Sequence, residues 1–317
     1  APGAVKGTFT LFNLPAFVIV MAITYLLYLG IKESKRVNNI MVILKILVVL
    51  LFIAVAAVYV KPHNWQPFMP MGFGGVFSAA ALVFFAFIGF DAVSSAAEET
   101  KNPAKDLPKG IIFSLLVCTI LYVTVSAIMT GVIPFAQFAG VDHPVSLVLQ
   151  SAGQNWVAGI IDIGAVLGMT TVMLVMLYGQ TRVMFAMSRD GLVPGSLSKV
   201  HPKHKTPYVA TWFFGTMSAL LGSLVPLDEL AKLVNIGTLS AFVLISVAVI
   251  VLRKKQPDLP RAFKCPGVPV IPGLAILFCL FLILNLGWVT IVRFLVWLLI
   301  GLVIYFLYSR KHSKLNQ

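Results

Sequence analysis

The sequence of 317 residues has few charged side chains, since Asp, Glu, Lys and Arg together make up 11% of it. Soluble and disordered chains carry considerably more charge than this. In contrast, 59% of the residues are hydrophobic and the mean hydropathy is +0.96. These values exclude the soluble and disordered classes and indicate an all-α polytopic membrane protein.

Cysteine and histidine are also scarce. The three cysteines are scattered and show neither metal-site nor disulfide spacing. The five histidines fall in predicted loops or the tail, and no nucleotide-binding, zinc-protease or Ser-His-Asp motif stands in a convincing context. We therefore expect no enzymatic activity, no catalytic residue, no metal and no cofactor.

Apolar runs of membrane-spanning length recur along the whole chain. A helix needs roughly 20 residues to cross a hydrocarbon core ~30 Å thick. Prolines, among them Pro103 and Pro108, are expected in the connections rather than inside helices. We predict one transmembrane domain over residues 1–317 with about nine spans. The spans are placed at approximately 14–31, 38–60, 74–98, 110–133, 156–181, 208–225, 229–252, 270–286 and 289–308.

Basic residues are distributed unequally between the predicted loops. Lys6, Lys61 and Lys232 lie on one side of the membrane in this topology, whereas 19 of the 24 basic residues lie on the other. Cytoplasmic loops carry an excess of Lys and Arg. This places the C-terminus in the cytoplasm, and it explains the net charge of +13 without a nucleic-acid partner. The 19 residues are Lys32, Lys35, Arg36, Lys101, Lys105, Lys109, Arg182, Arg189, Lys199, Lys203, Lys205, Arg253, Lys254, Lys255, Arg261, Lys264, Arg310, Lys311 and Lys314.

Two connections and three polar positions have simple interpretations. Segment 134–155 is predicted to be an extracellular surface loop, and 182–207 a cytoplasmic loop. Asp162 is interpreted as an interfacial residue, and Arg293 is expected to snorkel to the outer interface. Asn235, followed by Gly237 and Thr238, indicates close helix packing.

The run 74–98 differs from a plain membrane anchor. It carries Gly89 and the ionisable Asp91 near its middle, where an unpaired carboxylate is costly. We predict that the helix breaks near Ile88–Gly89 and that Asp91 caps a second half-helix. The alternative is a continuous helix with a packing glycine and an aspartate beside a water-filled crevice.

A broken helix has a chemical consequence. The first half would end with the unpaired carbonyls of Phe85, Ala86 and Ile88, which carry partial negative charge and suit an ammonium group. Irregular backbone inside a membrane persists only where it lines a cavity or is buried in protein. This arrangement is typical of a substrate site in a secondary transporter.

Four motifs follow one another in a specific order. They are Phe85–Asp91 with Ala97–Pro103, Tyr178–Arg182 with Ser188–Pro194, Asn235–Leu239, and Val251–Arg253 with Gln256–Pro257. In these motifs, and over essentially its whole length, the sequence resembles the amino acid–polyamine–organocation permeases. The resemblance is greatest to the bacterial branch similar to cationic amino acid transporters.

The resemblance implies an inverted-repeat transporter fold of twelve helices, with helices 1–5 and 6–10 forming the repeat. Aligning Phe85–Asp91 with the broken sixth helix of the family makes this sequence helices 4–12. Helices 1–3 are then expected to be missing, including the glycine-rich first helix that receives the substrate carboxylate in the family.

The resemblance also implies roles for individual residues. The main-chain carbonyls of Phe85, Ala86 and Ile88 would bind the substrate ammonium, and Phe85 would form part of an aromatic gate. Asp91 would lie beside this substrate pocket.

Three further residues are implicated in proton coupling. Lys45 matches a lysine in the fifth helix of the family, in the region where sodium-coupled relatives bind an ion. Thr170 and Thr171 lie where those relatives supply hydroxyl ligands. The alternatives are snorkelling for Lys45 and interhelical hydrogen bonding for the two threonines.

The resulting hypothesis is secondary active transport of amino acids across the cell membrane by proton symport and alternating access. The expected partners are the amino acid, protons and membrane lipids, and a small membrane-protein partner is left open. A truncated permease that does not transport is the alternative, followed by an ion channel, for which no repeated pore motif is visible in the sequence.

Overall fold

The structure is a computed structural model that describes residues 12–30, 35–90, 102–141, 143–261 and 263–314. The side chains of residues 35–38 lie outside this description. Within it the chain is helical and contains no strand. The α-helices are α1 (Leu14–Tyr28), α2 (Lys35–Ala56), α3 (Gly72–Phe87), α4 (Pro103–Val132), α5 (Pro144–Ser151), α6 (Asn155–Arg189), α7 (Tyr208–Leu224), α8 (Leu227–Lys255), α9 (Val270–Asn285), α10 (Trp288–Ile304) and α11 (Arg310–His312).

Each of the nine predicted spans overlaps one of these helices. Five helical stretches in the described chain are long and apolar enough to cross a membrane, and they comprise α2, α4, α6, α8 and α10 with its extension. Four shorter apolar helices of 10–17 residues, α1, α3, α7 and α9, occupy the other predicted spans. The prediction of a polytopic all-α membrane protein is therefore confirmed.

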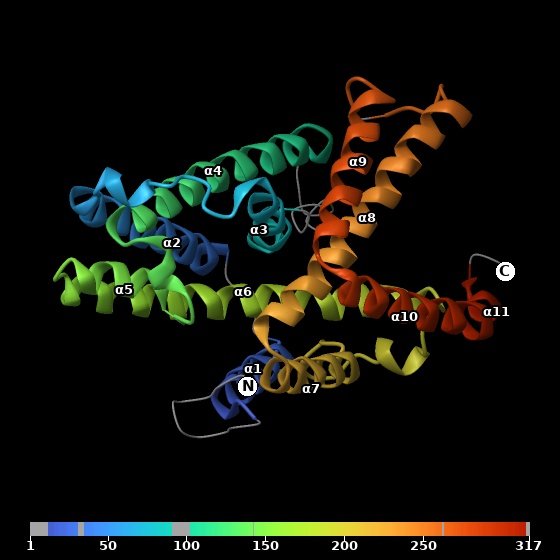
Figure 1. Ribbon diagram of the computed structural model, residues 1–317. Helices are drawn as coiled ribbons and strands as arrows, with labels where there is room; N and C mark the ends of the chain where they lie inside the picture. The colour runs from blue at the N-terminus through green and yellow to red at the C-terminus, as the bar shows by residue number, and fades with distance from the viewer. Residues whose placement is uncertain (1–11, 31–34, 91–101, 142, 262, 315–317) are drawn as a thin grey trace.

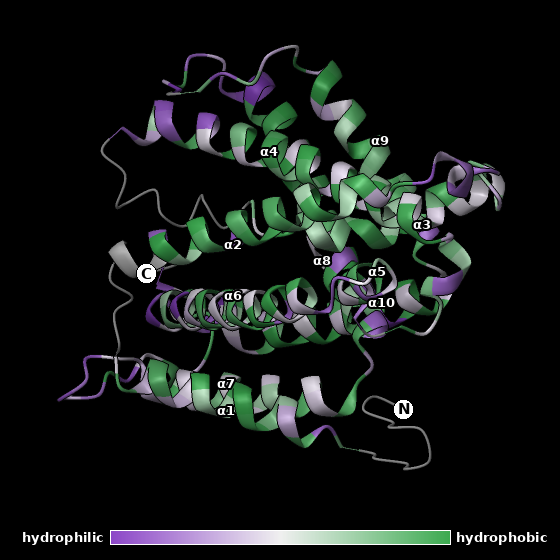
Figure 2. Cartoon of the chain, turned by 90° about the vertical axis from the view of Figure 1, so that its left-hand side faces the viewer, coloured by the Kyte–Doolittle hydropathy of each residue, from purple (hydrophilic) through white to green (hydrophobic). Residues whose placement is uncertain are grey.

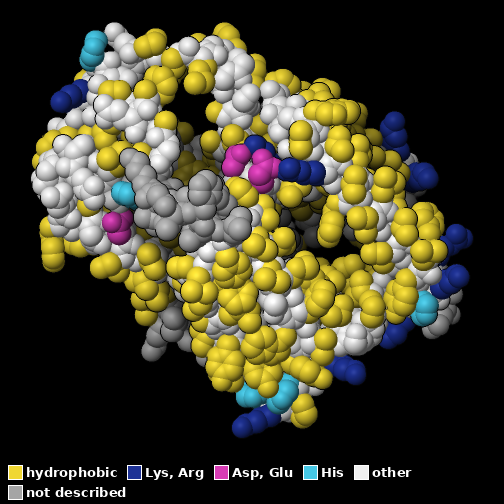
Figure 3. Space-filling model, turned by 60° about the horizontal axis from the view of Figure 1, so that its bottom comes forward, with side chains coloured by type: hydrophobic (Ala, Val, Ile, Leu, Met, Phe, Trp, Pro, Cys, Tyr) yellow, Lys and Arg dark blue, Asp and Glu magenta, His cyan; other side chains and the backbone are white. Residues whose placement is uncertain are grey.

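The outer surface fits a hydrocarbon environment. In Figure 2, hydrophobic residues predominate along the helices, and most strongly hydrophilic residues lie at helix ends and in connections. Hydrophobic side chains also cover most of the face in Figure 3, where many Lys and Arg side chains lie near the edges. Large apolar patches destabilise a protein in water but not in lipid, so this surface supports membrane insertion.

Helix α6 runs through the middle of the arrangement (Figure 1). Helices α2 and α5 pack against one part of it, and α1 and α7 form a closely packed pair that also contacts it. Helix α4 packs against α2, and a core cluster that includes Phe52, Val148, Leu149 and Ile161 joins these elements. Helices α8 and α9 pack against each other and against α3.

Glycines permit the closest helix crossings. A Cβ atom at Gly164 of α6 would lie 2.7 Å from Val48 Cγ2 of α2. A Cβ at Gly215 of α7 would lie 2.3 Å from Thr24 Cγ2 of α1, and Thr24 is fully buried. Small residues at such crossings let two backbones approach closely in a membrane, where dispersion contacts replace the hydrophobic effect.

Three sequence predictions about the connections are wrong. Helix α4 begins at Pro103 and therefore contains Pro108, which removes only one backbone donor near the helix start. Helix α6 continues to Arg189, so the first eight residues of the predicted 182–207 loop are helical. Segment 134–155 includes helix α5, whose residues Ser146, Val148 and Leu149 are buried, because its apolar side packs on α6.

Candidate functional site

Helix α3 ends where the sequence predicts a break. It ends at Phe87, after which Ile88 is extended with ψ of 131° and Gly89 has φ of +124°. L-amino acids with a side chain rarely adopt this positive φ, so glycine is required for the turn. The predicted second half-helix and Asp91 lie outside the described residues, and the proposed role of Asp91 stays a prediction.

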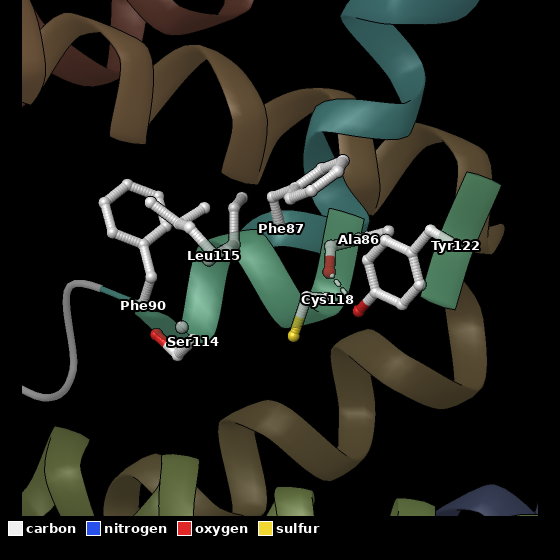
Figure 4. A pocket seen from close by; sticks show the side chains of 9 residues that line it. Ala86, Phe87, Phe90, Ser114, Leu115, Cys118 and Tyr122 are labelled. Atoms are coloured by element: carbon white, nitrogen blue, oxygen red, sulfur yellow. Dashed lines mark hydrogen bonds between the residues drawn. The ribbon is translucent and has the colours of Figure 1, made fainter. Parts of the chain in front are cut away.

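A pocket of about 220 Å³ opens beside this helix end. One wall is the α3 terminus, with Ala86, Phe87, Ile88, Gly89 and Phe90, and the other wall comes from α4. Figure 4 shows Ser114, Leu115, Cys118 and Tyr122 of α4 facing the α3 terminus. The described part of the wall carries no ionisable acid or base other than the Cys118 thiol and the Tyr122 phenol.

Two of the three predicted carbonyl ligands already accept hydrogen bonds within the protein. The Ile88 N–H donates to Phe85 O at 3.2 Å, and the Tyr122 hydroxyl donates to Ala86 O at 2.9 Å (Figure 4). A carbonyl oxygen has two lone pairs and can accept a second donor. The helix end thus offers partial negative charge together with a neighbouring hydroxyl that can both donate and accept.

The aromatic residues around the pocket differ from the expected gate. Phe87 packs edge-on against Tyr122 with ring centroids 5.1 Å apart, and Phe87, Phe90 and Tyr122 line the pocket. Phe85 is predicted as part of the gate, but its side chain is 41% exposed and it is not among the lining residues. A role for Phe85 in gating stays a prediction.

Sequence reasoning missed the contribution of α4. Ser114, Cys118 and Tyr122 are spaced four residues apart, which places them on one face of a helix. This stripe of small and polar residues within an apolar span was the available signal. Which neighbour the stripe contacts depends on tertiary packing, because nothing in its spacing refers to α3.

Lys45 of α2 lies at the crossing with α6, the helix that carries Thr170 and Thr171. The Lys45 stem lies against Gly168, where an added Cβ would be 3.5 Å from Lys45 Cε. The Thr171 hydroxyl donates to Gly168 O at 2.8 Å, and the Thr170 hydroxyl donates to Val166 O at the same distance. Both hydrogen bonds lie within α6, and the roles of Lys45, Thr170 and Thr171 in proton coupling stay predictions.

Other intramembrane polar residues have protein partners. The buried Ser146 of α5 donates a hydrogen bond to Asp162 of α6, so Asp162 joins two helices, and its interfacial position stays a prediction. Arg293 of α10 forms an ion pair with Glu229 of α8, and its snorkelling to the outer interface stays a prediction. Lys232 pairs with Asp228 and with Glu229 in the same region.

Comparison with known proteins decides the family. The family model described as "Amino acid permease" matches residues 4–309. The chain belongs to this amino acid permease family. This confirms the resemblance inferred from the four motifs. The protein therefore belongs to the class of multi-pass membrane transporters.

Named relatives within this permease family have different substrates in their names. The chain is 53% identical to the methylthioribose transporter of Bacillus subtilis (strain 168), over 100% of the chain and 68% of that protein. It is 32% identical to the branched-chain amino acid permease BcaP of Lactococcus lactis subsp. cremoris (strain MG1363), over 94% of the chain and 66% of that protein. It is 31% identical to cationic amino acid transporter 9, chloroplastic, of Arabidopsis thaliana, over 95% of the chain and 64% of that protein. The chain thus spans about two thirds of the length of these relatives.

Proposed function

We propose that this permease moves a small polar organic molecule across the cell membrane by secondary active transport, and that methylthioribose is its first candidate substrate. The observation that supports this most directly is the pocket at the C-terminal end of α3. It combines main-chain carbonyls with the hydroxyls of Ser114 and Tyr122 on an otherwise mainly apolar wall. Substrate sites of secondary transporters are commonly built at such discontinuous helices.

The pocket chemistry supports a neutral, partly apolar substrate. Methylthioribose has sugar hydroxyls, which can donate to Ala86 O and exchange hydrogen bonds with Tyr122, and a methylthio group, which suits contact with Phe87, Phe90 and Leu115. The 53% identity to a methylthioribose transporter extends over the whole chain, so the compared sequence includes the segments that line the pocket.

An α-amino acid is the second candidate, as the sequence predicts. The carbonyls of Phe85, Ala86 and Ile88 at the C-terminal end of α3 favour an ammonium group. In this proposal Asp91 lies beside the site on the other side of the break. The branched-chain amino acid permease and the cationic transporters among the relatives support this candidate.

We further propose that Lys45, with Thr170 and Thr171, couples transport to protons. Lys45 is the single charged residue in the apolar stretch Asn39–Tyr59, and it lies about 9 Å from Asn39 along the axis. Its stem lies at the α2–α6 crossing, where a change in ammonium charge alters the contacts between two helices. Lysine readily changes its protonation state in such an environment.

Uptake into proteoliposomes distinguishes the two candidates. The protein would be reconstituted with an inward proton gradient and offered radiolabelled methylthioribose or radiolabelled leucine in parallel. We expect concentrative uptake of methylthioribose, competed by the unlabelled compound and abolished by a protonophore. Leucine uptake without methylthioribose uptake would replace the first candidate by the second. Equal, non-saturable entry of both compounds would contradict transport and favour a channel.

A further inference from the structure

Helix α8 contacts the chain on both sides of the α3 end at Phe87. On the first side, the Asn235 side chain donates to Ala81 O at 2.8 Å and to Leu82 O at 3.3 Å. On the second, the Phe242 ring lies 5.5 Å from the ring of Phe90, which follows Gly89. Phe242 also lies 6.3 Å from Phe84, within the last turn of α3.

These contacts come from one face of α8. Asn235, Leu239 and Phe242 follow the i, i+4, i+7 spacing that aligns side chains along a helix. Leu239 is fully buried in a core cluster with Ala81, and Phe84 packs against the same cluster. One continuous stripe of α8 therefore covers α3 from Ala81 to the residue beyond the break.

Asn235 is an unexpected residue for this stripe. Its side chain is fully buried, and no group in the described part of the chain donates a hydrogen bond to its Oδ1 atom. A buried polar atom without a partner loses its hydration without compensation, so an apolar residue of similar size would stabilise the fold better. What the asparagine contributes instead is the pair of hydrogen bonds to the α3 carbonyls.

The site of these donations is close to the pocket. The Ala81 and Leu82 carbonyls belong to the turns that precede Phe85 and Ala86, because each carbonyl of an α-helix accepts from the residue four positions later. A shift of this segment along α8 would displace the pocket wall. The sequence pattern alone predicted only close helix packing around Asn235. Gly237 does not provide such a contact, because an added Cβ there has no atom of the described residues within 4 Å.

We propose that Asn235 and Phe242 are positioning residues that fasten the end of α3 to α8, so that α3 and α8 move as one body during transport. This inference rests on the proposed function only where its tests measure substrate uptake. The physical reason is that directional hydrogen bonds before the break and ring contacts across it fix both translation and rotation of the α3 end. Such a support keeps the pocket preformed before the substrate arrives.

The first test replaces Asn235 with leucine, which has a similar size and no donor. We expect Asn235→Leu to keep or raise the thermal unfolding temperature, because the unpaired oxygen is removed. We also expect methylthioribose uptake to lose at least fivefold in efficiency, mainly through a higher KM. Asn285→Leu is the matched control, since the Asn285 amide is exposed and donates to Phe281 O of its own helix. It should leave both quantities at the wild-type level.

A second variant tests the proposal independently of any misfolding caused by the substitution at the buried Asn235. Phe242→Leu removes the ring contacts to Phe84 and Phe90 without touching Asn235, and it should also raise KM. Phe242→Tyr retains the ring and should restore transport toward the wild-type value. Loss of thermal stability in proportion to loss of transport in both leucine variants would overturn the proposal, because it would indicate a purely structural role.

A readout without substrate separates this inference from the proposed function. Spin labels at Val83 and Leu244, both exposed, would report the α3–α8 distance in a background without Cys118, Cys265 and Cys279. We expect a narrow distance distribution in the otherwise unmodified protein and a broad one in Asn235→Leu. An unchanged distribution would overturn the proposal. Absence of uptake of every probe, with the predicted broadening still present, would instead contradict the proposed function alone.

Discussion

At the scale of single residues, Tyr122 is the side chain that connects the α3 terminus to α4. Its hydroxyl occupies one lone pair of Ala86 O, while its ring packs against Phe87. A phenol in this position can bind a hydroxylated substrate directly. Alternatively it competes with an ammonium group for the same carbonyl. The two candidate substrates therefore predict opposite effects when the hydroxyl is removed.

Tyr122→Phe removes the hydroxyl and retains the ring. For methylthioribose we expect KM to rise about fivefold, because one hydrogen bond contributes about 1 kcal/mol and 1.4 kcal/mol corresponds to a factor of ten. Saturation uptake in proteoliposomes measures this. The control is Tyr25→Phe, because Tyr25 lies on α1, outside the pocket lining. A lower KM in Tyr122→Phe would show competition for the carbonyl and favour the amino acid.

Lys45 is the residue on which the coupling proposal depends. Lys45→Met retains an unbranched apolar stem that can still lie against Gly168, but it cannot bind or release a proton. We expect normal folding and equilibrating transport, with accumulation driven by an imposed pH gradient reduced at least tenfold. Counterflow of labelled substrate against unlabelled substrate is the control, since it needs no proton gradient. Full accumulation in Lys45→Met would leave snorkelling as the interpretation.

At the scale of elements, the C-terminal segment is fastened to the connection after α6. The buried Ser309 donates to Leu192 O at 2.6 Å, and the Lys314 N–H donates to Asp190 O at 3.1 Å. Gly191 has φ of +81°, and an added Cβ would lie 2.1 Å from His312 O. No side chain fits between these backbones, so this glycine is required for the contact.

Gly191→Ala should therefore release the C-terminal segment. We expect trypsin to cleave at Arg310 and Lys311 roughly tenfold faster, because local opening exposes the backbone to protease. Gly153→Ala is a matched control with a similar φ of +75° and open space around an added Cβ. It carries the backbone strain without the clash, and its C-terminal cleavage rate should stay at the wild-type value. Equal acceleration in both variants would attribute the effect to strain alone.

At the scale of the whole molecule, helix order and loop charge together predict a topology. Alternate connections hold 19 of the 24 basic residues, and the apolar helices of the described chain overlap the predicted spans. The positive-inside rule then places position 140 outside the cell and position 256 inside. Both positions lie in described connections between helices, so a label can reach them.

Labelling of introduced cysteines tests this topology. Gly140→Cys should react with a membrane-impermeant maleimide in intact cells, whereas Gln256→Cys should react only after permeabilisation. The background would lack Cys118, Cys265 and Cys279, so that each signal has one source. Reaction of both cysteines from the same side would contradict a membrane topology with an odd number of spans between them.

The sequence alone determined the fold class, the order of nine apolar helices and the end of α3 near Ile88–Gly89. These are consequences of local properties, namely the length of apolar runs and the freedom of a glycine. Only the tertiary structure decided which groups meet, as Tyr122 with Ala86 O, Asn235 with Ala81 O, and Lys45 with Gly168. The members of each pair are 36 or more positions apart. Helix periodicity shows which residues share a face, but the partner of that face is selected by side-chain packing across the whole molecule.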